Sequence, residues 1–143
     1  MTGNQNEAKK IFSAVEEISK GELQSAEDVE RLIGIAVTNN KLDLLEQLSF
    51  QAKFSKGLFQ IIRNSSNEID PQYFKKIEAE LTESIGKIKN LFSEIISDSD
   101  NFIKNIFEEK YFSMTRTSLS NLSILCEDLG YLKLYFNDLK RRG

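Results

Sequence analysis

The side chains that most often perform acid–base, nucleophilic or metal chemistry are sparse in this sequence, which has one cysteine and no histidine. Without histidine, Ser–His and Cys–His catalysis, phosphotransfer through histidine and di-iron sites built on Glu-x-x-His are excluded. Cys126 has no lysine, arginine or histidine beside it in the sequence to lower the pKa of its thiol. We therefore expect Cys126 to be a small buried hydrophobic residue.

Carboxylates are the remaining candidates for chemistry. Asp98, Asp100 and Glu109 have part of the spacing of a calcium-binding loop, but the sixth position, which requires glycine, is Ile103. Most other acidic residues fall on the polar faces of predicted helices, as do Glu16, Glu17, Glu78, Glu80 and Glu83. Glycine-rich phosphate loops and paired-cysteine motifs are absent from the sequence. We predict no catalytic residues, no cofactor and no metal site, and we expect a protein that is not an enzyme.

The composition favours helices. The 143 residues are 40% hydrophobic and 29% charged, and they include one proline and seven glycines. This is apolar enough to form a core and too poor in turn residues for an all-β chain. We predict an all-α fold, a single compact antiparallel bundle of five or six helices, with residues 1–143 forming one domain.

Apolar residues at spacings of three and four predict the individual helices. The expected ranges are 7–20, about 26–39, 41 or 42 to 64, 71–97, 100–112 and 117–141. Gly21, the Asn39-Asn40 pair and Pro71 give three of the boundaries. Ser25 and Asp28 resemble an imperfect capping box. The break between 97 and 100 is favoured by Ser and Asp residues, although the heptad spacing continues across it.

The predicted helix 41–64 is unusually apolar around its circumference. One side carries Leu44, Leu45, Leu48, Ala52, Phe59 and Ile62. The apolar arc extends to roughly 220° through Phe50, Phe54, Leu58 and Ile61, about twice the stripe of a surface helix. Such a helix must be covered on two sides, so we expect either the central helix of the bundle or a helix at an interface.

The predicted last helix carries two apolar stripes. The first is a regular seam of Leu122, Leu125, Leu129, Leu132, Phe136 and Leu139. The second is formed by Ile124, Tyr131, Leu134 and Tyr135. Tyrosine offers a large contact area with a polar tip, so this second stripe is our predicted partner-binding site. It indicates a protein–protein interaction module that binds a protein partner or forms a homo-oligomer.

Two alternative functions are an enzyme of unknown type, which would have to use carboxylates or the single thiol, and a bundle that binds a small apolar ligand. Its cavity would be lined by Phe50, Phe54, Phe59, Phe102 and Phe107, with tyrosine hydroxyls or Arg116 orienting the ligand. The net charge of −3 argues against nucleic acid as a partner. Because the sequence shows no apolar membrane span and no signal-peptide core, we expect a cytoplasmic protein without membrane contact.

Overall fold

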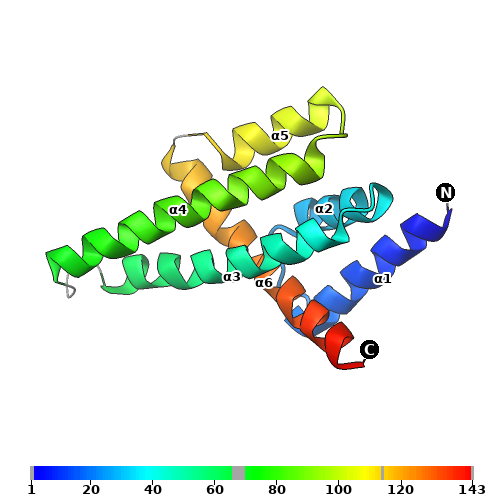
Figure 1. The fold of residues 1–143 in the computed structure, drawn as a ribbon, viewed down its shortest axis with the longest axis horizontal. Coiled ribbons are helices and arrows are strands. Elements are labelled where there is room, and N and C mark those ends of the chain that lie inside the picture. Colours follow the sequence, from blue (N-terminus) through cyan, green and yellow to red (C-terminus); the bar gives the residue numbers. More distant parts are fainter. Residues whose placement is uncertain (1, 66–69, 114, 143) are drawn as a thin grey trace.

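The computed structural model describes residues 2–65, 70–113 and 115–142, and these residues form an all-α bundle (Figure 1). Its helices are α1 (Thr2–Ser19), α2 (Ala26–Thr38), α3 (Leu42–Ser65), α4 (Pro71–Ile96), α5 (Asn101–Tyr111) and α6 (Arg116–Arg142). The predicted fold class is therefore confirmed. α1 begins five residues earlier than predicted, because its first turn is polar and carries no apolar periodicity.

α3 is the central helix of the bundle. It lies antiparallel to α4 and is crossed by α6, which runs in the opposite direction (Figure 1). α1 and α2 pack against each other, and both also contact α6. α5 turns back along the end of α4. The position of α3 confirms the prediction of a central helix, but part of its wide apolar arc, at Phe50, Phe54 and Ile61, remains exposed.

The helix boundaries follow local backbone chemistry. Gly21 adopts a left-handed φ of 75°, and its N–H donates to the Glu16 carbonyl 2.9 Å away, which closes the end of α1. Asn40 adopts a φ of 59° in the turn before α3. Asp70 caps α4 by accepting from the Gln72 N–H at 3.1 Å, with Pro71 at the first helical position. These three predicted boundaries are confirmed.

The break between α4 and α5 is also confirmed. The Asp100 carboxylate accepts a hydrogen bond from the Ile103 N–H at 3.0 Å, so this residue is an N-cap rather than part of a calcium loop. Phe107 of α5 returns to Phe92 of α4, with ring centroids 4.8 Å apart. Phe112 meets Phe92 edge-on at 5.2 Å. Aromatic packing therefore determines where α5 lies.

The core is formed mainly by α2, α3, α4 and α6. Five of the six predicted seam residues of α6 are buried: Leu122, Leu125, Leu129, Leu132 and Phe136. Leu139 is 46% exposed, so the seam ends one heptad position earlier than predicted. Cys126 is fully buried beside the seam, as expected, and burial raises the pKa of its thiol to about 12. That thiol is unreactive in the folded chain.

Candidate functional site

The side of α3 that faces away from the bundle is apolar. Its core side buries Leu45, Leu48 and Ala52 completely. At about 100° per residue, Phe50, Phe54, Gly57 and Ile61 lie together on the opposite side. Phe50 is 39% exposed, Phe54 51% and Ile61 37%. We call these four residues the outer face of α3.

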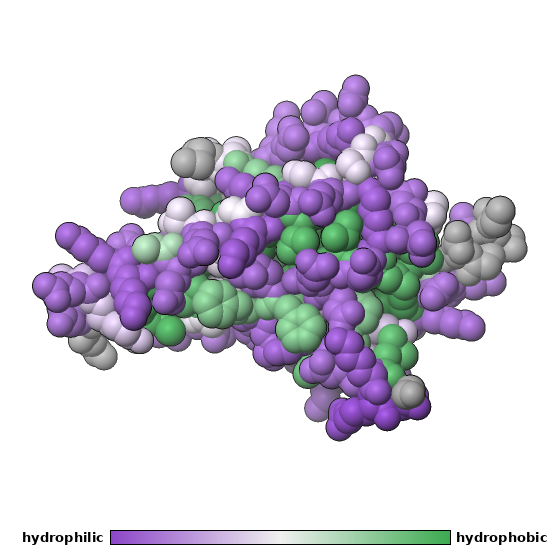
Figure 2. Space-filling model, viewed as in Figure 1, coloured by the Kyte–Doolittle hydropathy of each residue, from purple (hydrophilic) through white to green (hydrophobic). Residues whose placement is uncertain are grey.

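Figure 2 shows apolar side chains following the course of α3 across one side of the molecule, bordered by hydrophilic residues. The rings of Phe50 and Phe54 remain partly exposed. Gly57 carries no side chain, and an added Cβ there would meet no atom within 4 Å. Gly57 therefore leaves a gap between the larger side chains of the outer face, where a group of a partner can approach the backbone.

Lysines form one edge of the outer face, on the side of α6. The Lys133 ammonium lies 4.8 Å from the centroid of the Phe50 ring, and the Lys140 ammonium lies 5.7 Å from it. Lys140 also pairs with Glu46. Lys53 lies where α6 crosses α3, since its Cβ would be 3.8 Å from a Cβ built on Gly130. This edge carries more positive than negative charge.

Glutamates lie along the other edge, on the side of α4. Phe54 shares a small surface hollow of about 230 Å³ with Glu80, Glu83 and Lys87. Lys87 pairs with Glu83 at 3.6 Å, which leaves Glu80 as the surplus charge. A hydrogen bond joins α4 to α3 beside this hollow: the side-chain amide of Gln51 donates to Ser84 Oγ at 2.6 Å. The outer face of α3 thus lies between a basic edge and an acidic edge.

The predicted partner-binding stripe on α6 is only partly on the surface. Leu134 is 43% exposed. Tyr131 and Tyr135 are half-buried and pack against the core, and Ile124 is also half-buried. The Lys56 ammonium of α3 lies 5.9 Å from the Tyr131 ring. Burial raises the pKa of Tyr135, with a further contribution from Glu7 of α1, so the two tyrosines face neighbouring helices.

The five phenylalanines predicted to surround a ligand cavity do not lie together, and that prediction is wrong. Phe102 is 72% exposed on α5, whereas Phe107 of the same helix is fully buried. Phe50 and Phe54 are on the outer face of α3, and Phe59 packs against the core. A helical spacing shows which residues share a face but not which faces of different helices meet.

Two carboxylates, Asp128 and Asp28, are buried although the sequence did not predict it. Asp128 of α6 is 2% exposed, and it accepts hydrogen bonds from the N–H and the hydroxyl of Ser25, at 2.6 and 2.5 Å. The predicted capping box is therefore wrong, because the Ser25 side chain makes no cap within α2. Burial raises the pKa of Asp128, and the hydrogen bonds from Ser25 offset this in part. The available signal was spacing: Asp128 lies three residues after Leu125, in line with the seam.

Asp28 of α2 joins α5 to the bundle. It is 3% exposed, and it accepts from the Lys110 ammonium at 2.6 Å and from the Tyr111 hydroxyl. Burial raises the pKa of Tyr111, as does its hydrogen bond to Asp28. Arg31 completes the group at 3.4 Å. Each partner of Asp28 is occupied within the fold, so this group holds α5 against α2 and has no free nucleophile or base.

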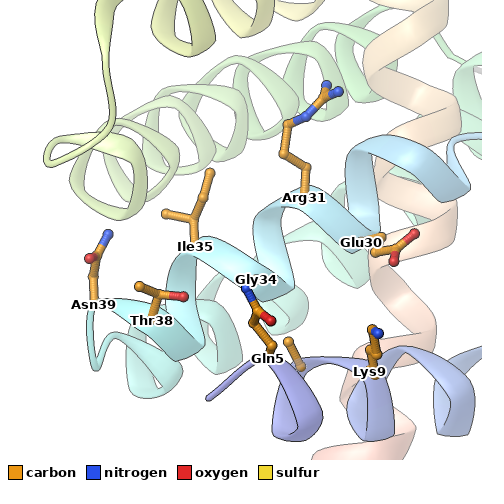
Figure 3. Close-up of a pocket in the computed structure, with 9 residues that line it drawn as sticks. Gln5, Lys9, Glu30, Arg31, Gly34, Ile35, Thr38 and Asn39 are labelled. Atoms are coloured by element: carbon orange, nitrogen blue, oxygen red, sulfur yellow. The ribbon is translucent and has the colours of Figure 1, made fainter. Parts of the chain in front are cut away.

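A groove lies between α1 and α2 (Figure 3). It has a volume of about 550 Å³ and is lined by Gln5, Ala8, Lys9, Glu30, Arg31, Gly34, Ile35, Thr38 and Asn39. Arg31 is already paired with Glu27 at 3.3 Å and with Asp28. The lining offers no nucleophile with an adjacent base. The groove is therefore a polar surface feature rather than a reactive site.

No family model, curated protein or solved structure matches the chain. Among the described residues, no group of three or more histidine, cysteine or acidic side chains is placed to hold a metal ion. None of the described helices combines the length and apolar character needed to cross a membrane.

Proposed function

We propose that this chain is a non-enzymatic protein–protein interaction module that pairs with a second copy of itself through the outer face of α3. One observation carries the proposal: three large apolar side chains, Phe50, Phe54 and Ile61, are exposed on the side of the central helix that faces away from the core. Covering such side chains releases water and stabilises a complex. A helix face with a glycine at its centre fits another helix.

The charges on the two edges select one orientation of the pair. If the two copies of α3 ran antiparallel, the two-fold axis would place the lysine edge of one copy against the lysine edge of the other. If they run parallel, with the axis along the helices, Lys53 and Lys133 of one copy face Glu80 and Glu83 of the other. Opposite charges attract across an interface and like charges repel, so the parallel arrangement is favoured.

Three partly exposed side chains supply less surface area than the roughly 800 Å² that each partner buries in a standard interface. The lysine and glutamate edges must therefore contribute contact area. We expect a reversible dimer that forms as concentration rises, rather than a permanent one. Its affinity should fall with added salt, because the edge contacts are exposed and screened.

The first test is Phe54→Ser, measured by sedimentation velocity over a concentration series. Burying a phenylalanine stabilises by about 1.5–3 kcal/mol, and the substitution occurs twice in each dimer, so the dissociation constant should rise at least about tenfold. Phe102→Ser is the matched control, since it removes the same side chain from a more exposed position on α5. Self-association of that variant should equal that of the original chain. A chain that stays monomeric at all concentrations contradicts the proposal.

The second test distinguishes the two orientations. In the parallel pair, each residue of the outer face meets its own counterpart, so Phe50→Cys and Ile61→Cys should each crosslink to themselves with a short bis-maleimide. Buried Cys126 does not compete for the reagent. Crosslinks found only in a mixture of the two variants would indicate antiparallel helices and would overturn the charge argument. Self-association would then stand without its proposed orientation.

A further inference from the structure

A second surface feature lies away from the outer face of α3, between α4 and the first turns of α6. It is a hollow of about 420 Å³, walled by α4, by the end of α5 and by α6, and it is lined by Thr82, Ile85, Gly86, Lys89, Tyr111, Ser113, Leu119 and Leu122. This volume falls within the range of small-molecule sites, about 300–1,000 Å³.

The inner part of the hollow is apolar. Leu122 is buried, Ile85 is half-buried, and Leu119 is 49% exposed although it is a large hydrophobic residue. Gly86 keeps the space open, because a Cβ added there would meet no atom within 4 Å. The exposure of Leu119 and the space over Gly86 have a common explanation if an apolar group lies between them.

The rim of the hollow is positively charged. Lys89 is half-buried, and its ammonium lies 5.8 Å from the centroid of the Phe112 ring. Among the described residues, none of the ion pairs involves Lys89. The first turn of α6, which includes Leu119, holds no acidic residue to neutralise the positive end of the helix dipole. Ser113 and Thr82 add hydroxyl groups to the lining.

We propose that this hollow binds a small amphiphile with an anionic head, of the class of a medium-chain fatty acid. The apolar tail lies against Ile85, Leu119 and Leu122. The carboxylate faces the Lys89 ammonium. The proposal is independent of self-association, because the lining residues are on other faces of the bundle from Phe50, Phe54 and Ile61.

The test is calorimetric titration of the chain with decanoate, with decanol as the neutral probe and decylamine as the cationic probe. Decanoate should bind more tightly than decanol, and decylamine should bind least. Lys89→Gln should lower the affinity for decanoate by roughly threefold to fivefold, the scale of a partly exposed ion pair, and leave the affinity for decanol unchanged. Lys75→Gln is the matched control, since Lys75 is an exposed lysine on the same helix but outside the hollow.

A second pair of variants tests the location. Gly86→Phe fills the hollow and should abolish binding of both decanoate and decanol. Gly86→Ala also replaces the glycine by a better helix former but leaves most of the space, and should bind like the original chain. Binding that survives Gly86→Phe, or no decanoate binding at millimolar concentration, overturns the proposed site. Equal affinities for decanoate and decanol, unchanged by Lys89→Gln, overturn the proposed anionic head.

Discussion

Replacing Leu129 by aspartate is expected to unfold the chain. Leu129 is fully buried in the middle of the α6 seam, where it belongs to the main core. The substitution removes about 1.5–3 kcal/mol of apolar burial and places a carboxylate inside the hydrophobic core, where burying a charge is costly. Domains of this size are stable by roughly 5–15 kcal/mol, so a loss of several kcal/mol leaves little folded protein. Far-ultraviolet circular dichroism should show the loss of helix.

Leu139→Asp is the control for this prediction. Leu139 continues the same sequence spacing on the same helix, but it is 46% exposed near the end of α6. The same chemical change should therefore cost less than about 0.5 kcal/mol and leave the helical signal intact. A Leu129→Asp chain that stays helical but no longer self-associates would mean that the seam, and not the outer face of α3, forms the dimer interface.

The sequence predicts the local structure well because the signals are local. The left-handed backbone at Gly21, the proline after Asp70 and the cap at Asp100 each depend on a few neighbouring residues. Hydrophobic spacing likewise identifies the buried side of each helix, as it does for Leu125 and Leu132.

The contacts between helices could not be predicted in this way. Asp128 and Ser25 are separated by 103 positions, and Asp28 and Tyr111 by 83. A helical plot of α6 places Asp128 beside its seam, but only the fold shows that the N-terminus of α2 supplies the partners of this carboxylate. Similarly, the spacing identifies Phe54 as part of a wide apolar arc, and only the packing of α4 and α6 decides that it remains exposed.

Asp128→Ala is expected to give the second largest loss, about 2–3 kcal/mol of unfolding free energy. The carboxylate accepts from both the N–H and the hydroxyl of Ser25, so its removal leaves the start of α2 without these hydrogen bonds. Urea denaturation measures the loss directly. Asp128→Asn keeps one acceptor oxygen and should therefore be less destabilising than Asp128→Ala. Adding Ser25→Ala to Asp128→Ala should not cost a full second share of unfolding free energy, because the two residues form one contact.

Asp128 also makes the unfolding free energy of the chain depend on pH. Burial raises the pKa of Asp128 above the ordinary aspartate value near 3.8, so the folded chain keeps this proton at pH values where the unfolded chain has lost it. The unfolding free energy contributed by this group is therefore largest below that ordinary value, and it falls as the pH rises through the raised pKa.

Asp128→Asn has no proton to lose. The unfolding free energy of the original chain minus that of the variant should therefore decrease as the pH rises from the ordinary aspartate pKa through the raised one. Urea denaturation of both chains from about pH 3.5 to pH 7 measures this difference. If the difference instead increases with pH, the hydrogen bonds from Ser25 outweigh desolvation, and the carboxylate is a net stabilising charge.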